Sequence, residues 1–426
     1  METLTTTFLL PDWISAGLAS GLYERVGGVV REVGTKQVVA WLREGFTLDG
    51  TAFPAFSGVP AIDPVTGTLK VVAQLVDTAI TAKGFGDVNH RLDGVQQQLG
   101  AMGQSLHNMQ GMLQITSAAS ILNLGVSVIG FGVVLHRLGE LEQRLQKAQV
   151  LLNQINRKID LGFYAKFRAA LELAKNAFTM SKPENRRSSA LSAINLFLEA
   201  EHIYTDYVDQ ELERKSQIAD EYLLTLSLAY LAEARCYLEL EEWDTALRRL
   251  QEGSAKIHAR LYKYIELLLT SNPAAYLDPQ LKGQIDLRRL TQVYAWLDPS
   301  LDENAVFELQ RENLFNWNKE RSIESGYKWV NSLPAAIVGS TEVKGSILGN
   351  REETKQEAMK RLPQIMEVME SIIETNYRFE GYQTEIKAIA QLCISFQDWM
   401  KLSPADEAPA EGTNLMVIVP AEPIAV

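Results

Sequence analysis

The sequence has few residues of the kinds that build redox, metal or hydrolytic sites. Its 426 residues include two cysteines and five histidines. Cys236 and Cys393 cannot form a disulfide framework or a zinc site built on cysteine, and the histidines follow no metal-binding spacing. A Glu-x-x-His pair, Glu199 and His202, lacks the second such pair that a di-iron site needs. The sequence therefore predicts no catalytic residue, no cofactor and no metal, and we expect a protein that is not an enzyme.

Basic residues are also scarce, both overall and near the start. Lysine and arginine number 41 against 53 aspartates and glutamates, which gives a net charge of −12. That balance excludes a nucleic-acid surface spread over the whole chain, so we expect no nucleic-acid partner. The first basic residue is Arg25, so the start lacks the positive region of a secretory signal peptide. We expect a cytoplasmic protein, with membrane association as the alternative that depends on the apolar segment described below.

Helical periodicity dominates the chain. Hydrophobic residues make up 46% and charged residues 22%, as in folded proteins. We expect a mainly α fold, in which a long antiparallel coiled-coil hairpin with an apolar tip packs on a multi-helix body, beside a small N-terminal β-hairpin region. The expected regions are a small N-terminal α/β region at 1–67, the coiled-coil hairpin at 68–162, the helical body at 163–402 and a Pro-rich tail at 403–426.

Short β-branched runs lie near both ends of the sequence. Residues 23–32 and 37–43 are two such runs, and the Gly-containing stretch 33–36 between them predicts a β-hairpin. A helix over the second run is the competing interpretation. The tail at 403–426 holds four prolines and is expected to be mostly disordered. Its apolar run Leu415–Val419 is the exception, since it could add a strand to the edge of a sheet.

Two heptad seams flank the middle of the coiled region. Apolar residues recur at alternating intervals of four and three from Val88 to Leu113, and again from Val134 to Ile159. This spacing is typical of helices that pair, either with each other or in a homo-oligomer. The residues that we expect to carry the coiled coil are Leu99, Leu106, Leu145 and Leu152.

Between the two seams the pattern inverts. No Asp, Glu, Lys or Arg occurs from Gly94 to His136, a run of 43 residues. Small and polar residues continue the contact stripe, while the positions between them are apolar. In lipid, helices contact one another through small residues and turn large apolar side chains outward. This reading predicts lipid contact by Ile121, Leu122, Val128, Ile129 and Phe131, and close helix contact at Ser120, Gly125, Ser127 and Gly132.

Three topologies suit the apolar segment 112–135. One helix would be about 36 Å long, enough to span a bilayer core of about 30 Å, but would leave a folded segment on the far side. A hairpin that turns near Asn123–Gly125 has nearly equal arms, 88–122 and 126–160, and each apolar half would dip into one leaflet. A buried central hairpin in a helical bundle is the third alternative, which Gln114 and Asn123 favour because they are costly in hydrocarbon.

The layout of coiled arms around an apolar hairpin, over about 73–160, resembles that of α-helical pore-forming proteins. The resemblance implies that an apolar tip is first covered by the helical body and then inserts into a membrane. Several copies would insert together. The first hypothesis is therefore a non-enzymatic helical protein whose hairpin associates with or inserts into membranes and oligomerises, possible partners being a lipid membrane and a second copy of the chain.

The body at 163–402 is expected to contain paired helices over 163–270 and further helices at 283–296, 303–321, 363–378 and 382–402, with a long loop at 326–350. Over 190–256 the residues Ala234, Tyr237, Glu241, Trp243, Ala246 and Leu250, echoed by Ala193, Phe197 and Ala200, resemble tetratricopeptide-type helical repeats. That resemblance implies a protein-binding groove.

The second hypothesis follows from this resemblance. It is a helical scaffold that dimerises through the coiled coil and binds a protein partner around Tyr237 and Trp243. Ordinary helix packing, with alanine where helices cross, remains the alternative explanation of the repeat-like pattern.

Overall fold

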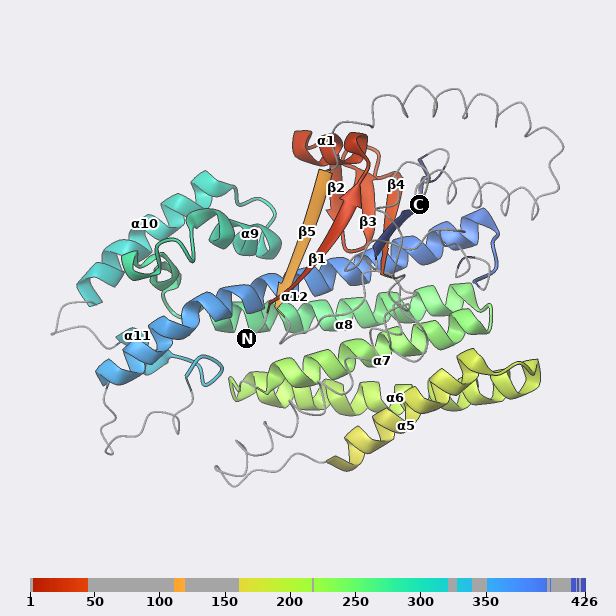
Figure 1. The fold of residues 1–426 in the computed structure, drawn as a ribbon. Helices are drawn as coiled ribbons and strands as arrows, with labels where there is room; N and C mark the ends of the chain where they lie inside the picture. Colours follow the sequence, from red (N-terminus) through yellow and green to blue (C-terminus); the bar gives the residue numbers. More distant parts are fainter. Residues whose placement is uncertain are drawn as a thin grey trace, which may run out of the picture.

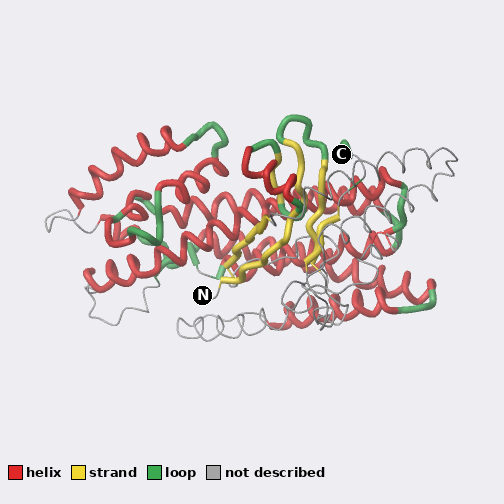
Figure 2. The backbone as a smooth tube through the Cα atoms, turned by 45° about the horizontal axis from the view of Figure 1, so that its top comes forward, coloured by secondary structure: helices red, strands yellow, loops and turns green. Residues whose placement is uncertain are grey.

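The computed structural model describes residues 3–44, 111–118, 161–216, 218–320, 328–338, 351–396 and short C-terminal stretches at 399, 415–418, 420 and 423–426. Within these residues the fold is mainly helical, with a small antiparallel sheet built largely from N-terminal residues (Figure 1), as the sequence predicted. Long helices lie side by side in one layer, and the strands lie against one face of that layer (Figure 2).

Four consecutive helices form most of the layer. They are α5 (Leu161–Thr179), α6 (Pro183–Glu213), α7 (Ala219–Glu239) and α8 (Trp243–Leu269), and each packs on the next. Helix α7 lies between α6 and α8 and is buried on nearly all sides. Its middle part, residues 222–232, contains no charged residue and is mostly apolar on every side, which suits a place in the interior. The predicted helical pairs over 163–270 are confirmed.

The layer is completed by a single helix of 42 residues, α12 (Arg351–Leu392), which packs on α8. The sequence predicted two helices here, at 363–378 and 382–402. Pro363 instead lies inside α12, whose buried face continues on both sides of it through Leu362 and Ile365. Tertiary burial therefore outweighs the local preference of proline, and the helix ends ten residues earlier than predicted.

Shorter helices cover one end of the layer. They are the 3-10 helices η1 (Pro273–Leu277) and η2 (Pro279–Leu281), and α9 (Leu287–Leu297), α10 (Glu303–Glu320) and α11 (Lys328–Ser332). Helices α9 and α10 agree with the predicted 283–296 and 303–321. Helix α11 falls in the predicted loop 326–350, of which residues 339–350 lie outside the described residues.

The main sheet has the order β2-β3-β4-β6 and is antiparallel throughout. Strands β3 (Val29–Glu32) and β4 (Val38–Glu44) form the predicted hairpin. The first predicted run is itself a second hairpin, because β2 (Tyr23–Val26) turns back at Gly27, whose φ of 57° suits glycine. Helix α1 (Asp12–Ser20) precedes these strands and packs Ile14 beside Val30 and Val39.

The C-terminal part of the chain supplies the last strand. Strand β6 (Leu415–Ile418) pairs with β4, and Ile424 forms a further bridge with Val38. The expectation that the run at 415–419 adds a strand to a sheet edge is confirmed for 415–418. The tail predicted to be mostly disordered therefore contains a paired strand.

A second, two-stranded sheet corrects the coiled-coil prediction in part. Strand β5 (Gly111–Ala118) pairs antiparallel with β1 (Thr3–Leu10), so that Leu113 lies opposite Phe8. The sequence placed residues 111–118 in a helix because Leu113 ends a heptad seam. Apolar spacing does not by itself exclude a strand, and the Thr-rich β1 offers its backbone as a partner. The predicted coiled-coil residues Leu99, Leu106, Leu145 and Leu152 lie outside the described residues.

The main sheet docks on α12 through two glycines. A Cβ added at Gly27 would lie 2.6 Å from the Cα of Arg378, and one added at Gly381 would lie 2.9 Å from the carbonyl oxygen of Val26. The β2–β3 turn therefore approaches the helix backbone to a distance that a side chain at either position would prevent. Beside this contact, Arg25 of β2 makes two hydrogen bonds of 2.9 and 2.6 Å to the carboxylate of Glu374 on α12.

Candidate functional site

Tyr237 and Trp243, the predicted partner-binding residues, lie on either side of the turn between α7 and α8. Tyr237 is in the last turn of α7 and Trp243 is the first residue of α8. Both side chains are half-buried and pack against the main core. The repeat-like residues Ala234, Ala246 and Leu250 are fully buried where α7 and α8 pack together.

The turn itself is tight and contains a residue in the left-handed region. Glu241 has φ 58°, and its backbone N–H donates to the carbonyl oxygen of Leu238 at 3.0 Å. The N–H of Glu242 donates to the carbonyl oxygen of Tyr237 at 3.0 Å, and the Glu242 carbonyl accepts from Ala246 at 2.9 Å. These bonds end one helix, begin the next and fix where Trp243 projects.

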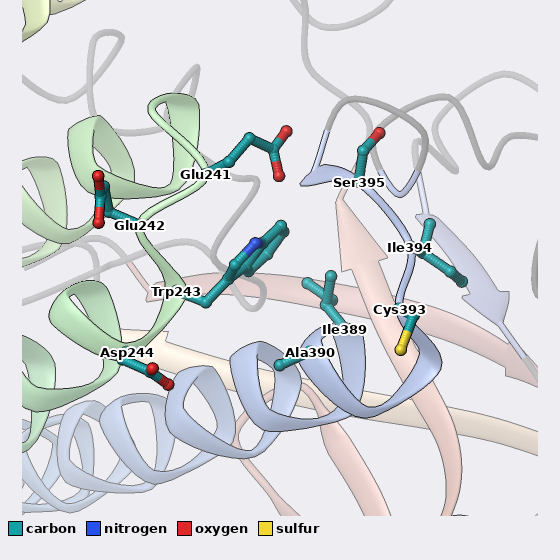
Figure 3. Close-up of a pocket in the computed structure, with 9 residues that line it drawn as sticks. All are labelled: Glu241, Glu242, Trp243, Asp244, Ile389, Ala390, Cys393, Ile394 and Ser395. Atoms are coloured by element: carbon teal, nitrogen blue, oxygen red, sulfur yellow. The ribbon is translucent and has the colours of Figure 1, made fainter. Parts of the chain in front are cut away.

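The end of α12 faces this turn and also contains a left-handed residue. Cys393, directly after the last helical residue, has φ 52°. Between the two helix ends lies a cavity of about 500 Å³, which we call the Trp243 pocket. The indole of Trp243 projects toward Ile389 of α12, and the Glu241 carboxylate and the Ser395 hydroxyl lie above it (Figure 3). The lining residues are Glu241, Glu242, Trp243, Asp244, Ile389, Ala390, Cys393, Ile394 and Ser395.

Phe396 and a buried arginine hold the wall of the pocket in place. The N–H of Phe396 donates to Glu241 Oε2 at 3.4 Å, and its ring meets that of Trp243 edge-on at 6.1 Å between centroids. Behind it, the fully buried guanidinium of Arg235 is stacked between Phe178 and Phe396, at 4.3 and 4.1 Å from the ring centroids. Burial lowers the pKa of Arg235. The carboxylate of Glu239, at 3.0 Å, acts in the opposite direction because it stabilises the charged guanidinium.

The two cysteines differ in accessibility. Cys393 is exposed at the pocket, whereas Cys236 is buried in α7, and burial raises the pKa of its thiol far above the usual range. Cys236 is therefore inert. Cys393 lies one residue beyond the end of α12 and is exposed.

A second buried polar cluster, which the sequence analysis missed, joins α6, α7 and α8. Arg249 of α8 makes hydrogen bonds of 2.9 and 3.0 Å to both carboxylate oxygens of Glu233, and it also pairs with Glu201 and Glu252. Burial, together with a hydrogen bond to Glu233 and its charge, raises the pKa of Glu201 to about 9, against the opposing effect of Arg249. The charged residues of this cluster come from three helices and are far apart in the sequence. The spacing of residues along the chain therefore does not reveal the cluster.

Within the described residues, no cluster of His, Cys, Asp and Glu could hold a metal, and Glu199 pairs with Lys166 at 2.7 Å. No helix in the described part of the chain is long and apolar enough to cross a membrane. The residues expected to contact lipid or neighbouring helices, 120–132, lie outside the described ranges. The structure does not test those assignments, which stay predictions.

No protein-family model, no curated protein and no solved structure was found to match this chain. The described residues define a mainly helical protein, with a layer of long helices and a small antiparallel sheet on one face.

Proposed function

We propose that the protein is a non-enzymatic helical adaptor that binds a protein partner in the Trp243 pocket. The observation that carries this proposal is the half-buried indole of Trp243, which projects into a cavity between two helix ends (Figure 3). Tryptophan is enriched among the residues that dominate binding energy at protein interfaces, particularly when it lies in a pocket. The cavity volume also lies in the range usual for ligand sites.

The backbone at the pocket gives independent support. Glu241 and Cys393 both lie within two residues of a helix end and adopt the left-handed conformation, for which glycine is the usual residue. A side chain there costs about 0.5–1 kcal/mol relative to glycine. Two such residues line the same cavity, and strained conformations of this kind concentrate at binding sites.

The surface cysteine supplies a direct test. Cys393 lies at the pocket and Cys236 is buried, so a thiol-reactive photocrosslinker will label Cys393 selectively in the folded protein. In Figure 3 Ile389 lies between the Cys393 sulfur and Trp243, so the label enters from the side of the pocket. Irradiation in cell extract should join the labelled chain to one dominant protein, which is then purified and tested for direct binding.

Variants decide whether that crosslink reports the pocket. Trp243→Ala should abolish the crosslink and the direct binding. Trp296→Ala, which alters a half-buried tryptophan on α9 whose ring contacts that of His258, should change neither the crosslink nor the binding. A crosslink that survives Trp243→Ala would contradict the proposal, as would the absence of any partner that binds the purified chain.

A membrane-active hairpin is the second candidate, and the uncharged run from Gly94 to His136 favours it. Purified protein mixed with dye-loaded liposomes tests this candidate between about pH 5 and pH 8, the range in which histidine side chains in general change charge. Leakage or flotation would support insertion, and the absence of both throughout that range would remove this candidate.

A separate experiment tests the expected coiled-coil oligomer. If Leu99 and Leu106 are replaced by aspartate, a coiled-coil dimer should dissociate, so an unchanged mass by light scattering would exclude it.

A further inference from the structure

The charges around the Trp243 pocket specify the chemistry of its occupant. We propose that the pocket receives a lysine or arginine side chain that an extended segment of the partner presents beside an apolar residue. This inference rests on the proposed adaptor function and adds to it the class of side chain that is recognised.

The rim of the pocket is negative. Glu241, Glu242 and Asp244 are exposed carboxylates, and none of the lining residues that the structure describes is basic. The nearby arginines of α8 are already paired, since Arg248 binds Glu252 at 2.7 Å and Arg249 is held by three glutamates. Glu241 also acts on the charge of the buried Arg235, but Arg235 is already paired with Glu239 at 3.0 Å. The described groups around the rim are therefore negative in sum and attract a positively charged ligand.

The interior of the pocket suits a long side chain with a charged end. Trp243 offers an indole face, the aromatic surface that binds cations best. Ile389, Ala390 and Ile394 offer apolar surface on which the methylene groups of lysine or arginine can pack. The same protein already uses this kind of contact directly behind the pocket, where Arg235 is stacked between two phenylalanine rings.

The arrangement of the carboxylates favours an organic cation over a bare metal ion. In Figure 3 the side chains of Glu242 and Asp244 diverge from the cavity, and only the Glu241 carboxylate lies above the indole. A divalent cation requires several oxygen ligands that converge on one point. Diverging carboxylates instead give a broad negative rim, which suits an extended segment with a basic residue at its centre.

Peptide binding tests this inference. An environment-sensitive dye on Cys393 reports occupancy, and the probes are blocked nonapeptides with a central lysine, arginine, glutamine or glutamate between two leucines. The lysine and arginine peptides should bind at least about ten-fold more tightly than the glutamine peptide. A higher salt concentration should reduce this difference in affinity. The glutamate peptide should bind most weakly.

Variants separate the roles of the indole and the rim. Trp243→Ala should weaken the basic peptides about ten-fold or more. The double substitution Glu242→Gln with Asp244→Asn should weaken them by about three- to ten-fold and leave the glutamine peptide unchanged. Glu303→Gln, which removes an exposed carboxylate at the start of α10, is the matched control and should have no effect. Thermal melting of each variant establishes that it is folded.

Two results would overturn the inference: equal binding of the glutamine and lysine peptides, or no binding of any basic peptide up to about 1 mM. Either would leave the adaptor function intact if a partner is still crosslinked in a Trp243-dependent manner. A crosslink that does not depend on Trp243 would instead remove the adaptor function itself.

Discussion

Two buried carboxyl groups in the same layer of helices show opposite shifts in pKa. Glu374, on α12, lies between Arg25 and Arg378, and although burial alone would raise its pKa, the two arginines lower it below the usual value. Glu201, on α6, shares one arginine with Glu233 and Glu252, and its pKa is raised to about 9.

The comparison shows that burial does not decide whether a carboxyl group is charged in this protein. The decisive quantity is the number of positive partners per carboxyl group. The Glu374 cluster, with two arginines, joins the sheet to α12 as an ion pair. The Glu201 cluster, with one arginine for two buried carboxyl groups, joins three helices, and Glu233 contributes to the raised pKa of Glu201.

The same substitution at the two sites should therefore have opposite effects, and the larger is expected at Glu374. Glu374→Gln removes the carboxylate that Arg25 and the buried Arg378 share and should lower the free energy of unfolding by about 3 kcal/mol or more. Urea denaturation measures it. A loss of less than about 1 kcal/mol would mean that the two arginines are solvated in the folded state.

The second prediction tests whether the Glu374 cluster depends on close backbone contact. Gly27→Ala places a Cβ 2.6 Å from the α12 backbone at a φ of 57°, so it should destabilise by about 2–3 kcal/mol. Gly21→Ala isolates the conformational part, since Gly21 has φ 75° and open space around it, and should cost about 1 kcal/mol. Equal losses at the two positions would show that the sheet does not approach α12 so closely.

The third prediction concerns pH. Because the pKa of Glu201 is about 9 when folded and near its usual value of 4.5 when unfolded, the folded state binds more protons between these values. The free energy of unfolding should therefore fall as pH rises from about 5 to 9. Glu201→Gln, which stays neutral and can donate to Glu233, should flatten this slope and stabilise the protein by about 1–3 kcal/mol near pH 8. Denaturation series across this pH range measure the free energy of unfolding of both proteins. If it changes equally with pH in the variant and in the unchanged protein, the prediction is wrong.

For Glu374 the expected pH dependence of the free energy of unfolding has the opposite sign. Its pKa is lowered in the folded state, so the stability that it contributes is present above its usual pKa of 4.5 and is lost as the pH falls below that value. Glu374→Gln should thus destabilise the protein most at neutral pH and least in acid. The same denaturation series measures this, and a loss that is independent of pH would contradict the assignment.

The smallest effects are expected at two exposed carboxylates: Glu252 of the Glu201 cluster, and Glu380, which belongs with Glu24 to a separate cluster around Arg31. Glu252 pairs with Arg249, and Glu380 pairs with Arg31 at 2.8 Å, but both glutamate side chains are well exposed. Glu252→Gln and Glu380→Gln should each change the free energy of unfolding by less than about 0.5 kcal/mol. A larger loss at either site would show that the exposed carboxylate belongs to the cooperative part of its cluster.

The sequence predicted those parts of the fold that depend on local pattern. The helices of 163–270, the β3–β4 hairpin and the strand at 415–418 each follow from periodicity or β-branched composition within a short window. Trp243 was singled out from repeat-like spacing, and the structure places it in a cavity.

The errors arise where distant contacts decide the structure. Residues 111–118 form a strand because β1, about 100 residues earlier, supplies their backbone partners. Helix α12 continues through Pro363 because both sides of it are buried. The other wall of the pocket, at Ile389–Ser395, and the Glu201 cluster bring together residues that no spacing rule connects.

The position of β6 has a consequence for synthesis on the ribosome. Strand β4 is made early, but the strand that covers its free edge, Leu415–Ile418, emerges only after the whole helical layer has been translated. Until then β4 presents an open row of backbone donors and acceptors, a template for unwanted strand addition. Completion of this sheet is therefore a late event in folding, and nascent chains that stop before residue 415 should aggregate more readily than full-length ones.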